Sequence, residues 1–432
     1  MKQLSIGILG LGQVGSALYR ILTSKKKYFE REVGVRFDVK KIAVKHPARK
    51  RKVRVPRELL TSHVREILYD PAIDVVVELM GGTKEAFTCV MEALKSGKHV
   101  VTANKALLAE RGDEIFELAN RQKKWVLFEA SVGGGIPVIK ALRQGLVANR
   151  IDSIYSIING TTNYILSSMS QKHKDFNEAL KEAQAKGYAE ADPTLDIEGV
   201  DAAHKLAIML RFGFGGKVRF RDIYSEGISK IRSEDIQFAE EFGYRIKLLA
   251  LAKHSNDGGI EARVQPTLLP KSHILANVNG SFNAVLIHGD EVGDVLLYGK
   301  GAGPEPTASA VVSDLIDIAK HDVGYLKGAK GHMRAIDKTL KIKSISSILS
   351  RYYLRFHIVD QPGMLAKISR VLGAHKISIS DVIQRERKAG GVVPLILITH
   401  DAHEHDVRTA MRKIDRLHIV RGKSQMLRIE GN

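Results

Sequence analysis

The chain has 432 residues, enough for two or three domains, and its hydrophobic content of 44% is ample for ordinary cores. A single cysteine, Cys89, excludes an intrachain disulfide and suits the reducing cytoplasm, and we expect neither a signal peptide nor a membrane span. The net charge of +19 is spread along the chain without an aromatic stacking motif, so it predicts attraction of anionic cofactors and no nucleic-acid partner.

The chain begins with a strand–turn–helix pattern. Leu4–Leu9 is predicted as a strand, the run GLGQVG follows at 10–15, and apolar spacing predicts a helix over Val14–Leu22. In such a unit the glycines allow a tight turn, close approach of a pyrophosphate and close helix packing, with the phosphates on the helix N-terminus. We therefore predict a dinucleotide site, with a purely structural turn as the alternative. The predicted contacts are Gly10, Gly12, Gln13, Val14 and Gly15.

The predicted second strand, Phe37–Val44, runs into the basic segment KHPARKRK at 45–52. An NAD site usually has an acidic residue there for the ribose 2′-hydroxyl, and here several cations stand in its place. We predict a 2′-phosphate pocket made by Lys45, Arg49 and Lys50, so that NADP(H) is preferred and NAD(H) is the second choice. A solvated loop with no cofactor role is the alternative.

Strand and helix patterns then alternate as in a doubly wound α/β sheet. The predicted strands are Val75–Leu79, His99–Thr102 and Trp125–Phe128, with helices ending near Lys95 and Gln122. Ligands of such sheets bind beyond the carboxyl ends of the strands, so the turns after them should converge. They contribute the candidate cofactor contacts Gly81, Gly82, Thr83 and Lys105 and the loop 129–137.

A second region is expected from about residue 150. A strand over Ile151–Ile158 ends in a polar loop, in which Gly160 and Thr161 are candidates to bind substrate, and helices dominate as far as about Gly243. Further strands are predicted at Ile246–Lys253, Glu261–Leu269, Asn283–Ile287 and Asp294–Leu297. The glycine cluster 299–303 precedes a helix to Lys320 and makes Gly303 a further candidate for close approach of a ligand.

The segment 183–205 is the most informative part of the chain. It places Glu190, Asp196 and Asp201 in and after a loop rich in turn formers, and a helix follows with Lys205 four positions after Asp201. The two side chains therefore project from one helix face. Carboxylates can hold the ammonium group of a substrate, and a lysine beside them can move a proton. A solvated acidic loop with an ordinary ion pair is the alternative.

The C-terminal region follows a basic, glycine-containing stretch at 324–345 that is predicted to be a linker. The expected elements are Arg351–Val359, Met364–Leu372, Ile377–Ile383, Val392–Thr399, a helix over 407–417 and Gln425–Ile429. This β-α-β-β-α-β order, with DQPGML at 360–365, resembles an ACT domain. The resemblance implies an amino-acid effector, most naturally threonine, bound near that first turn. A dimerisation role or a structural appendage is the alternative.

The complete pattern of residues 183–205 is similar to the signature of homoserine dehydrogenases. GLGQVG at 10–15, TANK at 102–105, EASVGGGIP at 129–137, NGTTN at 159–163 and YGKGAGPEPTA at 298–308 lie in that family's order and spacing. The resemblance covers residues 1–325. It implies reduction of aspartate 4-semialdehyde to L-homoserine with NADPH or NADH, on the path to threonine, methionine and isoleucine.

The resemblance also implies roles for single residues. Lys205 matches the proton donor, and Lys105 matches a second lysine near the reacting carbonyl and the nicotinamide. Glu190 matches a carboxylate that holds the substrate, and Asp196 and Asp201 match acids that position substrate and lysine.

A monovalent cation such as sodium is implied as well. Glu129, with the backbone carbonyls of Val132, Gly134 and Ile136, matches its site, and all-oxygen coordination suits a hard cation. Two positions depart from the commoner pattern, Gly133 for alanine and Ala106 for aspartate, and neither removes a functional group.

The expected domains are a Rossmann-type dinucleotide domain at 1–149, rejoined by part of 300–322, an α+β substrate and dimerisation domain at 150–322, a linker at 323–350 and an ACT-like domain at 351–432. A homo-oligomer, dimer or tetramer, is expected. Two alternatives remain: a catalytically inactive cofactor-binding sensor, and a dehydrogenase of another aldehyde. A thioester-forming enzyme is disfavoured because Cys89 is predicted within a helix over Thr83–Lys95.

Overall fold

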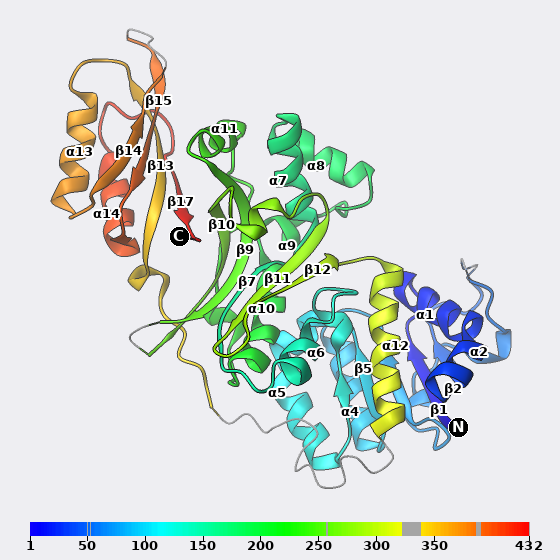
Figure 1. Cartoon of the computed structure of the whole chain (residues 1–432). Coiled ribbons are helices and arrows are strands. Elements are labelled where there is room, and N and C mark those ends of the chain that lie inside the picture. The colour runs from blue at the N-terminus through cyan, green and yellow to red at the C-terminus, as the bar shows by residue number, and fades with distance from the viewer. Residues whose placement is uncertain (50, 52, 256–257, 322–337, 386–389, 432) are drawn as a thin grey trace. The chain divides into compact units, whose positions relative to one another are not determined.

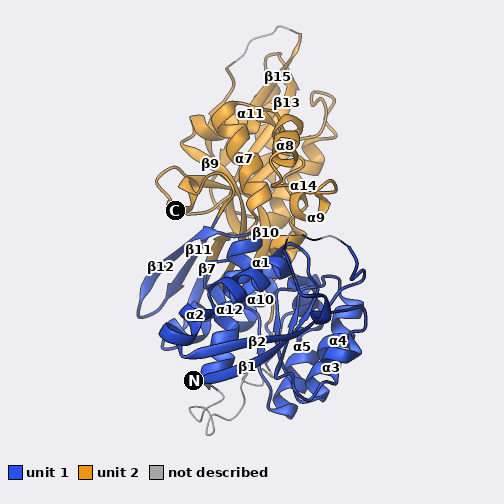
Figure 2. Cartoon of the chain, turned by 90° about the vertical axis from the view of Figure 1, so that its right-hand side faces the viewer, with its two compact units in different colours: residues 1–154, 203–222, 283–340 blue, residues 155–202, 223–282, 341–432 orange. Residues whose placement is uncertain are grey.

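The computed structural model describes residues 1–49, 51, 53–255, 258–321, 338–385 and 390–431. The chain divides into two compact units (Figure 2). The first unit contains Met1–Ile154, Ala203–Asp222 and Asn283–Leu340, and the second contains Tyr155–Ala202, Ile223–Phe282 and Lys341–Asn432. No helix in the described ranges combines the length and the apolar character that a membrane crossing requires.

The first unit is built on a parallel sheet with the strand order β3-β2-β1-β4-β5-β6. This order is that of a doubly wound sheet, the fold class predicted from the sequence, and it reverses between β1 and β4. Ligand-binding loops therefore follow the carboxyl ends of these two strands. The strands are β1 (Lys2–Leu9), β2 (Val35–Ala43), β3 (Leu60–Thr61), β4 (Val75–Glu78), β5 (His99–Thr102) and β6 (Val126–Leu127).

Helices cover this sheet, and two distant segments share one of its faces. Figure 1 shows α12 (Pro304–His321) lying beside α1 (Gln13–Ser24). Their apolar sides meet Ile6 and Ile8 of β1, with Leu18 and Leu315 in the same fully buried core. The other helices are α2 (Lys26–Tyr28), α3 (Arg65–Leu68), α4 (Lys84–Lys95), α5 (Lys105–Gln122) and α6 (Val138–Lys140).

The first unit also contains the neighbouring strands β11 (Phe282–Gly289) and β12 (Gly293–Lys300). The division between the units falls within β7 (Ile151–Ile157) and within α10 (Val200–Gly213). Part of the predicted linker, residues 322–337, lies outside the described residues. Its described remainder makes an isolated bridge from Thr339 to Lys217 and another from Ile342 to Ile260.

The second unit combines helices with a long antiparallel pair. Strands β9 (Tyr244–His254) and β10 (Ile260–Pro270) pair over their whole length, and the short β8 (Tyr224–Ser225) lies parallel to β10. The helices are α7 (Gly160–Lys172), α8 (Phe176–Ala185), α9 (Thr194–Ile197) and α11 (Ser233–Glu241).

The C-terminal module has the predicted β-α-β-β-α-β order and the strand order β17-β13-β15-β14. Its helices pack on Tyr352, Leu354 and Phe356, which are fully buried in one core. The elements are β13 (Leu349–Val359), α13 (Met364–Ala374), β14 (Ile379–Ile383), β15 (Val392–Thr399), β16 (Ala402–His403), α14 (Glu404–Ile414) and β17 (Gln425–Ile429).

The sheet of this module continues that of β9 and β10. Strand β17 pairs in parallel with β10, with Thr267 opposite Arg428. Arg428 and Glu404 are both fully buried and form an ion pair, and the Arg428 guanidinium lies 3.1 Å from Glu226. Burial alone would raise the pKa of Glu404, but the hydrogen bonds and charge of Arg428 hold that pKa below its usual value. The carboxylate is therefore bound as the charged form.

Candidate active site

The loop after β1 is shaped by its glycines. Gly10 has φ +101°, and a Cβ there would lie 2.6 Å from the Leu79 carbonyl oxygen, while a Cβ on Gly15 would lie 2.3 Å from the Gly10 oxygen. A Cβ on Gly12 would meet nothing within 4 Å. Gly12 is thus the position that opens to a ligand, just before α1 begins at Gln13 with no acidic side chain in its first turn. This cradle fits a pyrophosphate.

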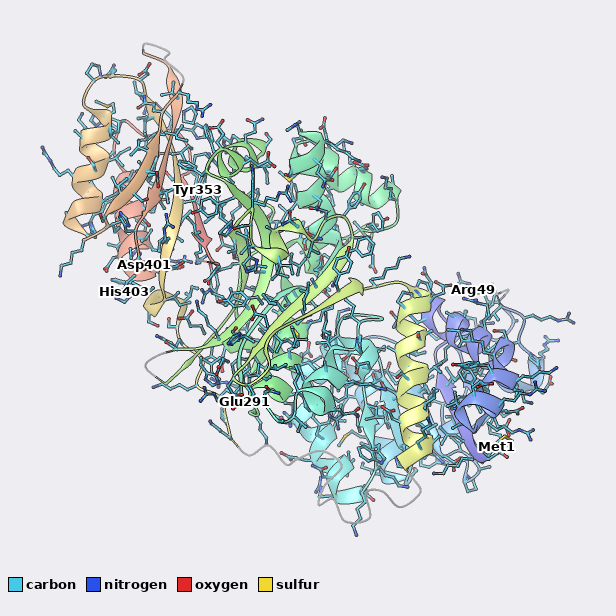
Figure 3. The ribbon with its side chains drawn as sticks, viewed as in Figure 1. Met1, Arg49, Glu291, Tyr353, Asp401 and His403 are labelled. Carbon is cyan, nitrogen blue, oxygen red and sulfur yellow. The ribbon has the colours of Figure 1, made fainter. Side chains whose placement is uncertain are left out.

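A pocket of about 890 Å³ lies over this cradle. Its lining includes the predicted contacts Gly10, Gly12, Gln13, Lys45, Arg49 and Gly81. Val14, Gly15, Gly82, Thr83, Lys105 and Gly303 do not line it, and Lys50 lies outside the described residues. Figure 3 shows Arg49 near the end of α12 at which that helix begins, where Pro304 also lines the pocket.

The basic loop at 45–51 is held in shape by an arginine to which the sequence had given no role. The Arg51 guanidinium donates to the carbonyl oxygens of His46, Pro47 and Arg49 at 2.7, 3.0 and 2.7 Å. Because the carbonyls of His46, Pro47 and Arg49 converge on one guanidinium, their backbone is fixed beside the pocket. The run of cations at 45–52 does not indicate that Arg51 is the one that binds the loop carbonyls.

A buried acid fixes the loops that follow β4 and β5. The Glu78 carboxylate accepts hydrogen bonds from the Thr102 hydroxyl at 2.7 Å and from the backbone N–H of Met80 at 2.8 Å. The Asn104 side chain donates to the Gly82 carbonyl at 2.7 Å and caps α5 by accepting from Leu107 N–H. Lys105, which is half-buried, directly follows Asn104. The hydrogen bonds of Asn104 therefore set the position of Lys105 at the start of α5.

In the second unit one side chain joins two of the predicted substrate acids. The Asn159 amide donates to Asp196 at 2.7 Å and to Asp201 at 2.8 Å, while its oxygen caps α7 by accepting from Thr162 N–H. The Thr161 hydroxyl lies 3.1 Å from the Asp196 carboxylate and 2.6 Å from the Tyr188 carbonyl. The structure thus brings together Thr161, Asp196 and Asp201, with Gly160 at the first position of α7.

Asn159 is a candidate functional residue that sequence reasoning missed. It was predicted only as part of a polar loop, although an asparagine directly before a helix is a common N-cap. Its amide holds the two carboxylates in fixed positions, and Asp201 and Asn159 are both more than nine-tenths buried. Such an arrangement presents acceptor oxygens suited to an ammonium group.

The remaining predicted residues of this segment differ in exposure. Glu190 is exposed, and its carbonyl accepts from Gln184 at 3.2 Å. Lys205 is 8% exposed and lies on α10, four positions after Asp201, as the apolar spacing predicts. Lys105 and Lys205 belong to the first unit, and Glu190, Asp196 and Asp201 to the second.

The predicted cation site lies in a buried loop of the first unit. The Glu129 carboxylate accepts backbone N–H groups of Ile139 at 3.0 Å and Lys140 at 2.8 Å, and the Glu129 N–H donates to Asp314 at 2.9 Å. Burial raises the pKa of Glu129 to about 7 and raises that of Asp314 as well. Two adjacent buried carboxyl groups favour a nearby positive charge.

The residues whose backbone carbonyls are predicted to bind the cation lie in a closely packed part of the loop. Val132 and Ile136 are buried, and Gly134 has φ +57° and packs so closely on Gly301 that a Cβ would lie 2.6 Å from the Gly301 carbonyl. The donor chemistry therefore fits a monovalent cation. Among the described residues no cluster of three His, Cys, Asp or Glu side chains is arranged to hold a metal ion.

Cys89 lies within α4 and is buried. Burial raises the pKa of its thiol to about 11, so the thiolate needed for a nucleophile is scarce at neutral pH. The thioester route disfavoured from sequence therefore finds no support in the environment of this residue.

Comparison with known proteins gives matches along the chain. A family model described as homoserine dehydrogenase matches residues 137–316, one described as the NAD binding domain of homoserine dehydrogenase matches 10–129, and one described as the ACT domain matches 352–418. The chain is 44% identical over 434 residues to the homoserine dehydrogenase of Pseudomonas aeruginosa, with 100% of this chain and 99% of that protein covered. For the Neisseria gonorrhoeae enzyme the identity is 45% over 437 residues with the same coverage.

Solved structures give the same picture. The structure is similar to that of a homoserine dehydrogenase from Thiobacillus denitrificans, with a TM-score of 0.90 and 45% identity over 100% of this chain and 99% of that one. It is also similar to a hyperthermophilic archaeal homoserine dehydrogenase mutant in complex with NADPH, with a TM-score of 0.63 and 28% identity over 75% of this chain and 100% of that one.

Proposed function

The chain belongs to the homoserine dehydrogenase family of NAD(P)-dependent oxidoreductases, and we propose that it interconverts L-aspartate 4-semialdehyde and L-homoserine. The resemblance predicted from the signature at 183–205 is thereby confirmed at the level of the family. The observation that carries the proposal is the Asn159 amide joining Asp196 and Asp201, because it fixes one carboxylate for the ammonium group of an amino-acid substrate and a second carboxylate for Lys205.

We assign the substrate contacts to the second unit. Asp196 and Glu190 bind the amino group, and Gly160 and Thr161 contact the substrate at the start of α7. Asp201 orients Lys205 on α10. These roles follow the residue types: carboxylates neutralise an ammonium group, and the N-terminal turn of a helix offers N–H groups to a carboxylate.

We assign proton transfer and charge stabilisation to the two lysines. The nicotinamide, when bound, supplies the hydride that the aldehyde carbon receives. As that carbon is reduced, negative charge develops on its oxygen, and the ammonium group of Lys105 stabilises it. Lys205 donates a proton to the same oxygen, so that the aldehyde becomes a primary alcohol, and it takes the proton back when homoserine is oxidised.

The reaction is tested by incubating the protein with L-homoserine and NADP+ while the absorbance of the reduced nicotinamide is followed. We expect absorbance to rise with homoserine and not with L-threonine or L-serine, because the site has to match both the amino group and the position of the primary alcohol. The same assay is run with NAD+, and no rise with homoserine under either cofactor would refute the proposed reaction.

We further propose that NADP(H) is preferred to NAD(H). Lys45 and Arg49 line the pocket over the Gly12 cradle, and no acidic residue follows β2 within residues 44–52. A 2′-phosphate bound by such cations forms charge-assisted hydrogen bonds. The similarity to an archaeal relative in complex with NADPH supports this choice.

Removing one of these cations is expected to weaken NADPH binding selectively. For Arg49→Ala, Lys45→Ala and Lys50→Ala we expect the NADPH Kd to rise roughly tenfold or more for at least one variant, the usual loss for one charged hydrogen-bond partner, with little change for NADH. Fluorescence titration measures both constants, and Lys95→Ala, on the exposed side of α4, is the control. Equal affinities of the unchanged protein for the two cofactors would contradict the preference.

We propose that sodium binds at Glu129 and the carbonyls of Val132, Gly134 and Ile136. A cation there offsets the cost of the buried Glu129 and Asp314 carboxylates and pins the loop 129–137. We expect the thermal midpoint at pH 8 to be on the order of a few degrees higher in sodium chloride than in choline chloride of equal ionic strength. Calorimetry checks this, and Glu129→Gln should abolish the difference while exposed Glu291→Gln keeps it. A midpoint independent of the cation excludes the site.

Regulation and assembly complete the proposal. We propose that the ACT domain binds threonine near the turn 360–363, where Gly363 adopts φ +83° before α13, and that the protein is a homo-oligomer, a dimer or a tetramer. We also propose that residues 1–149 with part of 300–322, residues 150–322 and residues 351–432 act as the cofactor, substrate and regulatory domains, with 323–350 as the linker between the last two.

A further inference from the structure

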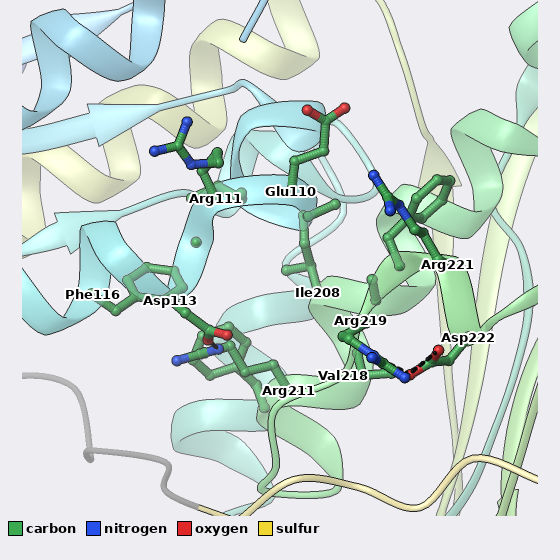
Figure 4. Close-up of a pocket in the computed structure, with 16 residues that line it drawn as sticks. Glu110, Arg111, Asp113, Phe116, Ile208, Arg211, Val218, Arg219, Arg221 and Asp222 are labelled. Carbon is green, nitrogen blue, oxygen red and sulfur yellow. Dashed lines mark hydrogen bonds and ion pairs between the residues drawn. The ribbon is translucent and has the colours of Figure 1, made fainter. Parts of the chain in front are cut away.

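A second pocket of the first unit lies between helices α5 and α10 (Figure 4). Its volume is about 740 Å³, which suits a small molecule. Phe116, Ile208, Phe212 and Phe220 contribute apolar surface to its lining. No residue of the cofactor pocket lines it, nor does any of the residues assigned above to the substrate or the cation.

Most charges around this pocket are already paired. Arg211 forms an ion pair with Asp113, Arg219 lies 2.9 Å from Asp222, and Arg111 pairs with Glu114. These pairs leave the pocket wall electrically balanced.

Two exposed charges of opposite sign remain on the rim. Across the parts of the chain that the structure describes, Glu110 and Arg221 form neither an ion pair nor a hydrogen bond through their side chains. Figure 4 shows both on the upper side of the pocket in that view, with Ile208 below them. One side chain that can bind an anion and one that can bind a cation therefore stand on the rim of a pocket whose lining includes Phe116, Ile208 and Phe212.

We propose that this pocket binds an L-α-amino acid with an apolar side chain. Arg221 receives the carboxylate and Glu110 the ammonium group, each through charge-assisted hydrogen bonds. The side chain enters the pocket against Phe116, Ile208 and Phe212, where removal of its apolar surface from water favours binding. The free amino acid carries all three features, whereas a simple amine or a simple acid lacks one of them.

The place of the pocket gives such a ligand a route to the reaction. Helix α5 begins with Lys105, and Leu108, one turn later, lines the pocket. On α10, Ile208 lies one turn after Lys205 and also lines the pocket. The Phe220 ring lies 4.3 Å from that of His204, the neighbour of Lys205. A ligand in this pocket therefore changes the packing of the two helices that carry Lys105 and Lys205, and with that packing it changes kcat. This effect on kcat rests on the proposed function. The binding of the ligand does not.

Calorimetric titration of the full chain with L-leucine tests the binding. Two analogues of L-leucine are titrated for comparison: 4-methylpentanoic acid, which lacks the ammonium group, and 3-methylbutylamine, which lacks the carboxylate. We expect L-leucine to bind and each analogue to bind roughly tenfold more weakly or worse. Glu110→Gln and Arg221→Gln should weaken L-leucine by a similar factor, whereas Glu291→Gln and Arg150→Gln, exposed and outside the pocket, should not.

Two results overturn the site. One is the absence of any heat with L-leucine at its highest soluble concentration. The other is binding that is the same in Glu110→Gln, Arg221→Gln and the unchanged protein, because the amino acid then binds elsewhere. The effector role is tested separately in the homoserine assay: an unchanged kcat at saturating L-leucine rejects that role, and absence of any homoserine oxidation rejects the proposed reaction without touching the binding result.

Discussion

Replacing Lys205 by alanine is expected to lower kcat roughly 10²-fold or more, the usual range for loss of a general acid or base. The Lys205 side chain is buried on α10, and alanine has no group that can donate a proton. Because Lys205 is assigned to the carbonyl oxygen and not to the cofactor, the NADPH Kd should change little. Steady-state kinetics in both directions measures kcat, and a fluorescence titration measures the NADPH Kd.

The matched control for this variant is Lys95→Ala, which removes an exposed lysine that forms an ion pair with Glu92 in α4. Its kcat should stay within about twofold of that of the unchanged protein, because exposed ion pairs contribute little. If Lys205→Ala retains most of its kcat, the proton comes from another group and Lys205 has no place in the mechanism.

Replacing Arg428 by leucine is expected to destabilise the second unit by about 3 kcal/mol, the low end for breaking a buried ion pair. The substitution leaves the fully buried Glu404 without its closest partner, although Arg408 remains 2.7 Å from the same carboxylate. For a cooperative unit of 150–250 residues this corresponds to a loss of roughly 6–12 °C in the midpoint. Scanning calorimetry measures it.

The pH dependence gives an independent check on that variant. The pKa of Glu404 in the folded protein lies below its usual value, so the stability from this pair is present above the unfolded pKa of about 4.3 and is lost as pH falls through the folded pKa. The difference between Arg428→Leu and the unchanged protein should therefore shrink in acid. Arg150→Leu, which breaks an exposed pair with Asp152, should show neither effect.

The cofactor half of the site was predictable because its signals are local. The strand expected at Leu4–Leu9 is β1 (Lys2–Leu9), and the helix expected from Val14 is α1. The turn between them depends on glycines whose conformations are fixed within a few residues. Apolar alternation likewise predicted β10 and β15 almost to the residue, because period and length are properties of short segments.

The parts that sequence reasoning missed depend on contacts between distant residues. Asn159 meets Asp196 after 37 positions, and Glu78 meets Thr102 after 24. Nothing in the neighbourhood of either residue indicates the partner. The two-residue strand β3 is formed only because β2 offers an edge to Leu60 and Thr61, so its own sequence carries too little signal.

The basic loop shows a different limit. The run of cations at 45–52 predicted an anion pocket, and the pocket lining contains Lys45, His46, Arg49 and Arg51. A run of cations does not show which of them face a ligand and which one binds the backbone of the loop. That distinction needs carbonyl positions, which only the folded backbone provides.

The pairing of β17 with β10 decides how the C-terminal module can be altered without damage to the rest of the second unit. A stop codon after the substrate domain would strip β10 of its neighbour at Thr267 and Leu268 and leave an open strand edge, the feature through which sheets aggregate. It would also leave the buried Arg263 without Glu430. A test of the effector site proposed near the turn 360–363 should therefore substitute side chains around that turn and keep the last strand of the chain.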